Sequence, residues 1–220
     1  MSKIEQIPCW DLSDLYNSIE SKKIFQDLEE INIEILYFIE KYRNKLISLN
    51  IKDLYDSILQ YEQIKEKIEK IYSFIDLITS ENLLDTELSN KSYSLRETLD
   101  QYSAKIMFFT LEINKFSSKK VVEISKNENI SRYVEWINNL RSMKNYQLKE
   151  DLERLFIEKK TTGKNSWVRL FDETIASIFV EIKNEKYSLD KALDLISSSS
   201  NGEFRKTIGL SLSKEFDKKE

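Results

Sequence analysis

Three short patterns in the sequence contain residue types that enzymes use for chemistry. Thr-Gly-Lys at residues 162–164 resembles the end of a phosphate-binding loop, whose backbone amides and lysine hold a nucleotide. Ser117 and Lys120 have the Ser-x-x-Lys spacing, in which the lysine can assist a nucleophilic serine. Asp11 and Asp14 form a carboxylate pair of the kind that can contribute to a cation site. Each pattern is short, so its chemistry depends on further residues that must also be present.

The phosphate-loop pattern lacks those further residues. A phosphate loop needs a glycine five positions before its Gly-Lys pair and a serine or threonine after it, between a strand and a helix. Glu158 occupies the first of these positions and Asn165 the second, and the residues before them have the spacing of a helix. The stretch is therefore predicted to be a turn between two helices.

The chain of 220 residues contains no histidine. Histidine is the commonest general acid or base and zinc ligand, so its absence excludes His-Glu-x-x-His zinc sites, Ser-His-Asp triads and Cys-His dyads. The 38 acidic residues offer many carboxylate pairs but no specific pair for carboxylate-only catalysis. Ser117 and Lys120 are better explained as an exposed helix start, and Asp11 and Asp14 as part of an N-terminal arm. We therefore predict no catalytic, cofactor-binding or metal-binding residue in this chain.

The composition is typical of a soluble helical protein. Only three glycines and one proline are present, which is too few for the many tight turns of a β-sandwich or barrel. The net charge of −4 comes from interleaved acidic and basic residues, without the basic footprint of a nucleic-acid binder. Cys9 is the single cysteine, so no internal disulfide can form, and a reducing compartment is expected. No signal peptide or membrane span is recognisable, and the expected location is the cytoplasm.

Apolar residues at helical spacing predict three long helices, over about 21–46, 51–79 and 84–116. Asn50 can cap the second helix, and the buried stripe of the first is predicted to be Leu28, Ile31, Ile35, Phe38 and Tyr42. Rods of this length joined by short loops should pack antiparallel as an elongated bundle. The spacing also permits a coiled coil, but the aromatic and isoleucine residues spread beyond a strict two-stranded seam. The N-terminal arm is expected to pack on these helices through Trp10, Leu12, Leu15 and Tyr16.

The second half of the chain contains shorter elements. Helices are predicted from Ser117 through Ile124 and over 130–143, followed by one over 148–160 with Leu152, Leu155 and Phe156 inward. Gly163 is predicted to end that helix in the left-handed conformation, and Asn165 or Ser166 to cap the next one. A β-hairpin near residues 178–188 and two further helices follow. The predicted fold is therefore mainly α, an elongated antiparallel helical bundle with a short hairpin. It divides into an arm and long-helix bundle over 1–116 and a part with shorter helices and the hairpin over 117–220. Together the two parts are expected to form one continuous lobe of a larger fold.

Four stretches carry a resemblance to a known family. They are Trp-Asp-Leu-Ser-Asp-Leu-Tyr at 10–16, Phe-Phe-Thr-Leu-Glu-Ile-Asn at 108–114, the segment 152–173 that ends in Ser-Trp-Val-Arg-Leu-Phe-Asp-Glu, and Leu-x-x-Ala-Leu-x-Leu-Ile at 189–196. In this order and approximate spacing, the set resembles the N-terminal part of the oligoendopeptidase F family, zinc metallopeptidases related to thimet oligopeptidase. Asn17, Tyr146 and the Thr-Thr pair at 161–162 depart from the residues usual in the family, which affects only local turns.

The resemblance implies a helical lobe that walls one side of a deep channel and restricts substrates to short peptides. It also implies that zinc, the His-Glu-x-x-His motif and a third glutamate ligand belong to a catalytic half that this chain lacks. No catalytic or zinc-binding residue of the family therefore maps onto a position of this sequence.

The leading hypothesis is a non-catalytic N-terminal lobe, from a truncated or split reading frame or a fragment, that cleaves nothing on its own. Its expected partner is a separate catalytic metallopeptidase chain, and short peptides would bind only in the assembled enzyme. Nucleic acid and membranes are not expected as partners. One alternative is a free-standing helical interaction or adaptor protein without a role in proteolysis. The other is a decaying gene product with no function, which predicts a large exposed apolar patch.

Overall fold

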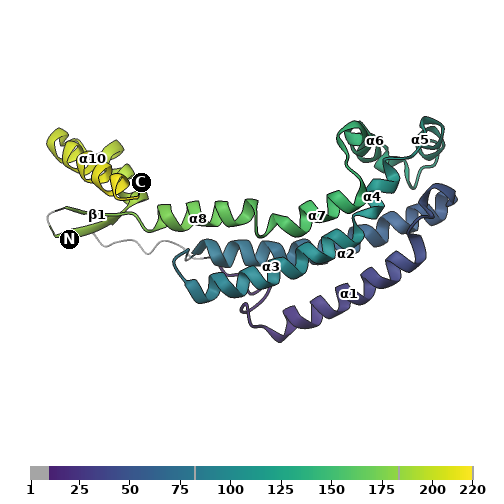
Figure 1. The fold of residues 1–220 in the computed structure, drawn as a ribbon, viewed down its shortest axis with the longest axis horizontal. Helices are drawn as coiled ribbons and strands as arrows, with labels where there is room; N and C mark the ends of the chain where they lie inside the picture. Colours follow the sequence, from purple (N-terminus) through teal and green to yellow (C-terminus); the bar gives the residue numbers. More distant parts are fainter. Residues whose placement is uncertain (1–9, 82, 183, 220) are drawn as a thin grey trace.

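The computed structural model describes residues 10–219 apart from 82 and 183, and helices dominate it. The three long helices are α1 (Lys22–Tyr42), α2 (Ile51–Glu81) and α3 (Thr86–Ile106). Figure 1 shows them side by side, with α1 along one edge of an elongated molecule. Three short helices follow at one end: α4 (Phe108–Ile113), α5 (Ser118–Ser125) and α6 (Val134–Ser142). Among the described residues, no helix is both long and apolar enough to cross a membrane.

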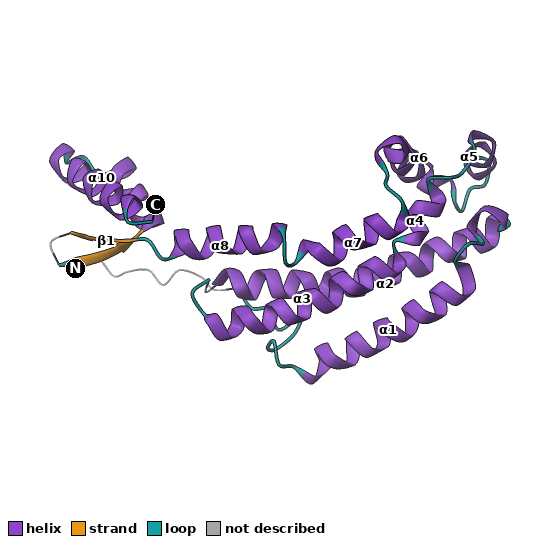
Figure 2. Cartoon of the chain, in the orientation of Figure 1, coloured by secondary structure: helices purple, strands orange, loops and turns teal. Residues whose placement is uncertain are grey.

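The rest of the chain runs back along the bundle and beyond it. It consists of α7 (Glu150–Lys160), α8 (Lys164–Ala176), strands β1 (Phe179–Ile182) and β2 (Glu185–Ser188), α9 (Leu189–Ser198) and α10 (Gly202–Asp217). The strands pair antiparallel, with Val180 opposite Tyr187, and Asn184 lies in the turn between them with a φ of 66°. Figure 2 shows this single hairpin beside the helices of the described chain. The mainly α fold with a short hairpin near 178–188 is therefore confirmed.

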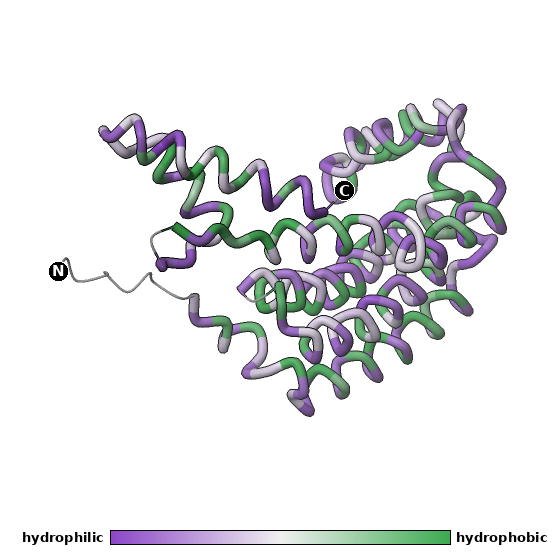
Figure 3. The backbone as a smooth tube through the Cα atoms, turned by 60° about the vertical axis from the view of Figure 1, so that its left-hand side comes forward, coloured by the Kyte–Doolittle hydropathy of each residue, from purple (hydrophilic) through white to green (hydrophobic). Residues whose placement is uncertain are grey.

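The main core lies where the apolar stripes of the long helices meet. On α1 the predicted stripe of Leu28, Ile31, Ile35, Phe38 and Tyr42 is buried throughout, and Figure 3 shows such apolar positions recurring along the tube. The Phe38 ring lies 5.2 Å from that of Phe109 and 5.7 Å from that of Phe108, between centroids. Aromatic ring pairs at this separation stabilise a core beyond its buried area alone. The long helices are thus held by side chains at the spacing that the sequence predicts.

A second, smaller core lies under the hairpin. It is formed by buried side chains of the hairpin and the last two helices, namely Ile178, Val180, Ile182, Ala192, Ile208 and Leu212. Among the described residues, helices α7 and α8 contribute none to either set of buried apolar side chains.

The N-terminal arm packs only in part as predicted. Tyr16 is buried, and its ring packs edge-to-face with that of Phe74, with 5.3 Å between the ring centroids. Its hydroxyl donates a hydrogen bond to Asp27 Oδ2 at 2.8 Å. Leu12 and Leu15 pack against the main core. Trp10 is 81% exposed, so the prediction that it packs on the bundle is wrong. Cys9 lies outside the described residues.

Capping side chains begin several helices where the sequence predicts. Asn50 Oδ1 accepts from the backbone N–H of Asp53 at 2.9 Å, and Ser117 Oγ accepts from that of Lys120 at 3.2 Å. These bonds satisfy donors that a helix leaves unpaired in its first turn. The Lys120 ammonium donates to the backbone oxygen of Leu49 at 2.9 Å. The Ser-x-x-Lys pattern is therefore a helix start, as predicted.

The predicted single helix over 84–116 is interrupted. Helix α3 ends at Ile106 and α4 begins at Phe108. Phe108 and Phe109 are adjacent and both almost fully buried, which one narrow stripe on a straight helix cannot achieve. The interruption lets the Phe109 ring stack on the Tyr61 ring, with 4.7 Å between their centroids. The rings of Phe108 and Phe109 both pack against that of Phe38. The prediction of one continuous helix is therefore wrong at this point.

A glutamate on α4 holds the turn that follows α1. Glu112 Oε1 accepts from the backbone N–H of Asn44 at 2.6 Å, and Glu112 Oε2 accepts from that of Leu46 at 3.2 Å. Asn44 has a φ of 63°, the left-handed conformation that asparagine tolerates better than most residues. Because both donors are backbone groups, the carboxylate fixes the path of the chain out of α1.

Candidate functional site at the joint of helices α7 and α8

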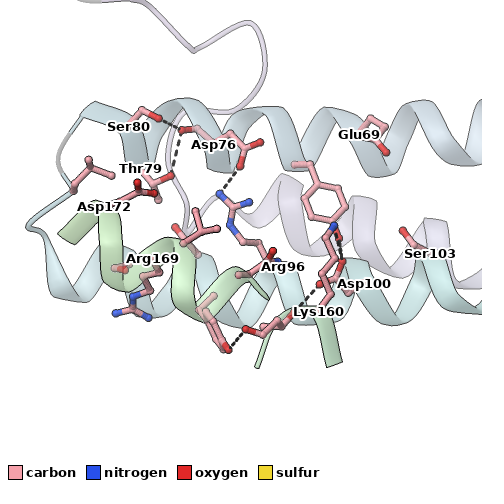
Figure 4. Close-up of a pocket in the computed structure, with 18 of the residues that line it drawn as sticks. Glu69, Asp76, Thr79, Ser80, Arg96, Asp100, Ser103, Lys160, Arg169 and Asp172 are labelled. Atoms are coloured by element: carbon pink, nitrogen blue, oxygen red, sulfur yellow. Dashed lines mark hydrogen bonds and ion pairs between the residues drawn. The ribbon is translucent and has the colours of Figure 1, made fainter. Parts of the chain in front are cut away.

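Residues 161–163 join α7 to α8, and a buried aspartate holds this joint against the bundle. Asp100 on α3 is 4% exposed, and its Oδ1 accepts a hydrogen bond from the Tyr72 hydroxyl at 2.6 Å. Its Oδ2 accepts from Thr161 Oγ1, also at 2.6 Å, and Lys160 Nζ lies 3.9 Å from Oδ1. Figure 4 shows Asp100 and Lys160 facing each other across this contact. A buried carboxylate needs such donors and a nearby cation to offset its lost hydration.

Burial and the Asp100 carboxylate both raise the pKa of Tyr72. Burial of the phenol raises the pKa of Tyr72 well above its usual range, and the hydrogen bond that it donates to Asp100 raises it further. The hydroxyl therefore stays protonated and remains a donor to Asp100 at any physiological pH.

A second group of bonds holds the backbone oxygen of Thr161. The Tyr93 hydroxyl donates to this oxygen at 2.7 Å, and Ser166 Oγ donates to it at 2.8 Å. The Arg169 guanidinium lies 5.8 Å from the centre of the Tyr93 ring and pairs with Glu173 at 2.6 Å. Thr161 is thus fixed to α3 through both its side chain and its carbonyl, and α8 is tied to the same point.

The glycine at the joint is needed for space and not for a left-handed conformation. Gly163 has φ −105° and ψ −104°, so the predicted left-handed helix end is wrong. A Cβ atom built on Gly163 would lie 2.9 Å from the backbone oxygen of Lys159, closer than real Cβ contacts occur. Gly163 is also the N-cap residue of α8, without a capping side-chain bond, so the predicted caps at Asn165 and Ser166 are wrong as well. Ser166 instead bonds Thr161.

Replacing Gly163 by alanine is expected to lower the free energy of unfolding by about 2 kcal/mol, the usual scale of overpacking. The clash is with backbone, which cannot move aside like the end of a flexible side chain. Urea unfolding followed by circular dichroism measures the change. Gly209→Ala is the matched control, because a Cβ atom there meets nothing within 4 Å. Equal stability of the two variants would contradict the inference that Gly163 is required for space at the joint.

The phosphate-loop reading fails in the structure as in the sequence. The residues before Gly163 form α7 and not a strand, and the Lys164 side chain is exposed without a hydrogen-bond or ion-pair partner among the described residues. Asp11, from the other short pattern, accepts from the backbone N–H of Ser13 at 2.9 Å, and such bonds lower the pKa of Asp11. In the described part of the chain, no group of three or more histidine, cysteine or acidic side chains lies close enough to hold a metal ion.

A cleft of about 690 Å³ lies between α2, α3 and the α7–α8 pair. Charged side chains line it from all sides, but most of them are paired across or along its walls. Arg96 pairs with Asp76, and Lys65 pairs with Glu69 at 2.6 Å. Figure 4 shows Glu69 and Asp76 on one bundle helix and Arg96 on the other. The buried hydroxyl of Ser92 has no hydrogen-bond partner among the described residues. Because the charges are nearly balanced, the cleft favours neither cations nor anions.

The opposite side of α7 and α8 carries a large exposed apolar surface, here called the outward face. Its side chains are between 42% and 82% exposed, and they are Tyr146 and Leu148 just before α7, Leu152, Leu155 and Phe156 on α7, and Trp167 and Phe171 on α8. The inward residues of the same helices line the cleft, among them Ile157 on α7 and Arg169 on α8. The prediction that Leu152, Leu155 and Phe156 point inward is therefore wrong. Free surfaces of soluble proteins rarely gather so many large apolar side chains, which is typical of a face that another element covers.

Sequence reasoning identified the joint but missed the residues that hold it. Asp100, Tyr72 and Tyr93 were not singled out. One signal was available: Ser92, Arg96, Asp100 and Ser103 recur at helical spacing on α3, where a wholly apolar stripe would be expected next to another helix.

Comparisons with known proteins give one match. Residues 112–179 match the family model Peptidase_M3_N, described as oligopeptidase F. Searches of curated proteins and of solved structures found no match. The matched segment begins at Glu112 and includes all of α7, the joint and α8. It confirms the resemblance over this segment, and residues 10–16 and 189–196 lie outside it.

Proposed function

Because residues 112–179 have the N-terminal sequence pattern of the oligopeptidase F family, we propose that the chain acts as a non-catalytic helical lobe of a peptidase. In this proposal the outward face of α7 and α8 packs against the catalytic unit of a zinc metallopeptidase. The lobe then walls one side of the channel in which that unit cleaves short peptides. The observation that carries the proposal is the outward face itself, which lies entirely within or beside the matched segment.

Two features of the structure support packing against a large partner. The outward face contains aromatic side chains, with Phe156 65%, Trp167 73% and Phe171 64% exposed, and such side chains dominate the energetics of protein interfaces. The Asp100 contacts hold the joint against α3, so the two helices present their apolar side chains from a fixed position. A preorganised surface loses less entropy on binding than a mobile one.

The zinc of such an enzyme does not fit this chain. The chain has no histidine, and its described acidic residues form no cluster that could hold a metal ion. The metal and the residues that activate water would therefore belong to the catalytic unit. The role of this chain is to position that unit and to restrict access to it.

Reconstitution tests the proposal. The purified chain with added zinc is expected to cleave a fluorogenic peptide no faster than buffer does. Mixing it with a chain of the same family that contains His-Glu-x-x-His but lacks this lobe should give a one-to-one complex and restore cleavage. Phe156→Asp on the outward face should weaken the complex at least about tenfold, the scale of a single interface anchor.

Phe25→Asp on α1 is the matched control, because Phe25 is a similarly exposed phenylalanine outside the outward face, at 56%. It should leave the complex unchanged. Metal-dependent cleavage by the purified chain alone would overturn the proposal. Binding of another class of protein to the same face, without any effect on proteolysis, would favour the adaptor alternative.

A further inference from the structure

Two lysines lie in the middle of the outward face. Lys159 follows Leu155 by four residues and Phe156 by three, and Lys164 precedes Trp167 by three. Residues three or four apart share one side of a helix, so each ammonium lies beside an apolar cluster. The face is therefore apolar at both ends and positively charged at its centre, next to the joint.

Among the residues that the structure describes, these two lysines differ from the other cations of α7 and α8 because no carboxylate pairs with them. Lys160 lies near Asp100, Arg154 lies 3.6 Å from Glu158, and Arg169 pairs with Glu173. Lys159 and Lys164 are exposed, and neither side chain has an ion-pair or hydrogen-bond partner within the part of the chain that the structure describes. Any surface that covers them must supply carboxylates, since burying an unpaired ammonium is costly.

The same charges oppose pairing of two copies through this face. Symmetric pairs of identical faces bring each residue near a fixed counterpart on the other copy. In an antiparallel pair centred on the joint, Lys159 of one copy would meet Lys164 of the other. In a parallel pair, each lysine would meet its own equivalent. Like charges come together in both arrangements, although the apolar ends alone would favour association.

We propose that the outward face is built for a partner whose surface is apolar with an acidic centre, and that Lys159 and Lys164 exclude a second copy of this chain from it. This inference rests on the proposed function for the identity of that partner, the catalytic unit. The exclusion of a second copy depends only on the face. Charge arranged in this way selects between partners and speeds encounter with the correct one.

Charge reversal tests the exclusion of a second copy. Sedimentation velocity of the purified chain should show a monomer. Lys159→Glu should self-associate at least about tenfold more tightly, because its carboxylate would face Lys164 of the other copy twice per antiparallel pair. The double variant Lys159→Glu, Lys164→Glu restores like charges and should return to a monomer. Lys119→Glu, the same change at an exposed lysine on α5, should stay monomeric.

A wild-type chain that dimerises as readily as Lys159→Glu would overturn the exclusion, and so would a monomeric Lys159→Glu variant. Circular dichroism of each variant shows whether it is folded. Because both lysines are exposed, we expect no change in helix content.

The acidic centre is tested on the complex with the His-Glu-x-x-His chain. Lys159→Glu should weaken this complex at least about tenfold, while Lys119→Glu should not. Binding of the wild-type chain should also weaken as salt rises from about 0.05 to 0.5 M, because screening shortens the reach of charges. Equal binding of wild type and Lys159→Glu would contradict the inference that the partner surface has an acidic centre, and it would leave the proposed function in place. A catalytic chain that does not bind at all would overturn the proposed function, whatever the sedimentation result.

Discussion

Replacing Asp100 by alanine is expected to lower the free energy of unfolding by about 3 kcal/mol, the scale of breaking a buried charged network. The substitution would leave the Tyr72 hydroxyl and Thr161 Oγ1 without their acceptor in a buried place. It would also leave Lys160 without its nearby carboxylate. Removing one member of such a network costs more than the net strength of its bonds, because the remaining polar groups stay buried and unpaired.

The effect should be largest at the joint of α7 and α8. Urea unfolding measures the overall loss, and amide hydrogen exchange locates it. Exchange should accelerate in α7 more than in α1, because the Asp100 contacts tie α7 to the bundle while α1 is held by the aromatic core. If the proposed function holds, the same variant should also bind the catalytic unit less well, since the outward face would lose its fixed position.

Three variants separate the contributions to the Asp100 effect. Asp100→Asn keeps the size and one acceptor oxygen and should cost less than Asp100→Ala. Tyr72→Phe and Thr161→Val each remove one donor and should each cost about 1 kcal/mol, the usual net value of one hydrogen bond. If Asp100→Ala unfolds at the wild-type urea concentration, the buried network does not stabilise the joint, and the anchoring of α7 must come from elsewhere.

Local elements were well predicted because their signals are local. Apolar residues three and four apart place a stripe on one side of a helix whatever it packs against, so the long helices were recognisable. Asn50 and Ser117 act within three residues of their own positions, so their capping roles were recognisable too. The hairpin followed from a β-branched run and a short turn.

Contacts between distant parts of the chain could not be read from these signals. Asp100 bonds Thr161 across 61 residues, and Glu112 bonds Asn44 across 68. A polar residue in a helix looks the same in the sequence whether it faces solvent or a backbone amide far along the chain. The left-handed residue was likewise expected at Gly163 but occurs at Asn44 and Asn184. Glycine signals only that a side chain is absent, and at residue 163 the reason is the nearby Lys159 oxygen.

The orientation of α7 could not be predicted from its sequence pattern either. Its apolar spacing correctly predicts a helix with one apolar face. Periodicity states that a face exists but not which neighbour covers it. Leu152, Leu155 and Phe156 were therefore assigned to the core, whereas Ile157 and Lys160 line the cleft and the three predicted core residues are exposed. The direction in which an apolar helix face points therefore depends on neighbours that periodicity does not reveal.

Replacing Glu112 by alanine is expected to lower the free energy of unfolding by about 3 kcal/mol, since hydrogen bonds to charged groups each contribute roughly 1.5 kcal/mol or more. The backbone N–H groups of Asn44 and Leu46 would lose their common acceptor. Leu46 is fully buried, so its amide cannot easily bond water instead. Thermal and urea unfolding of the purified variant measure the loss.

Glu112→Gln tests whether the charge matters, because its amide keeps one oxygen and should restore part of the stability. Asn44→Gly tests the turn itself and should change stability little, since glycine adopts a φ of 63° without strain. Glu128→Ala, at an exposed glutamate in a turn, controls for loss of a negative charge. Equal stability of Glu112→Ala and Glu128→Ala would show that the carboxylate does not hold the turn. A selective loss in Glu112→Ala would mean that Glu112, the first residue of the matched segment, stabilises the bundle.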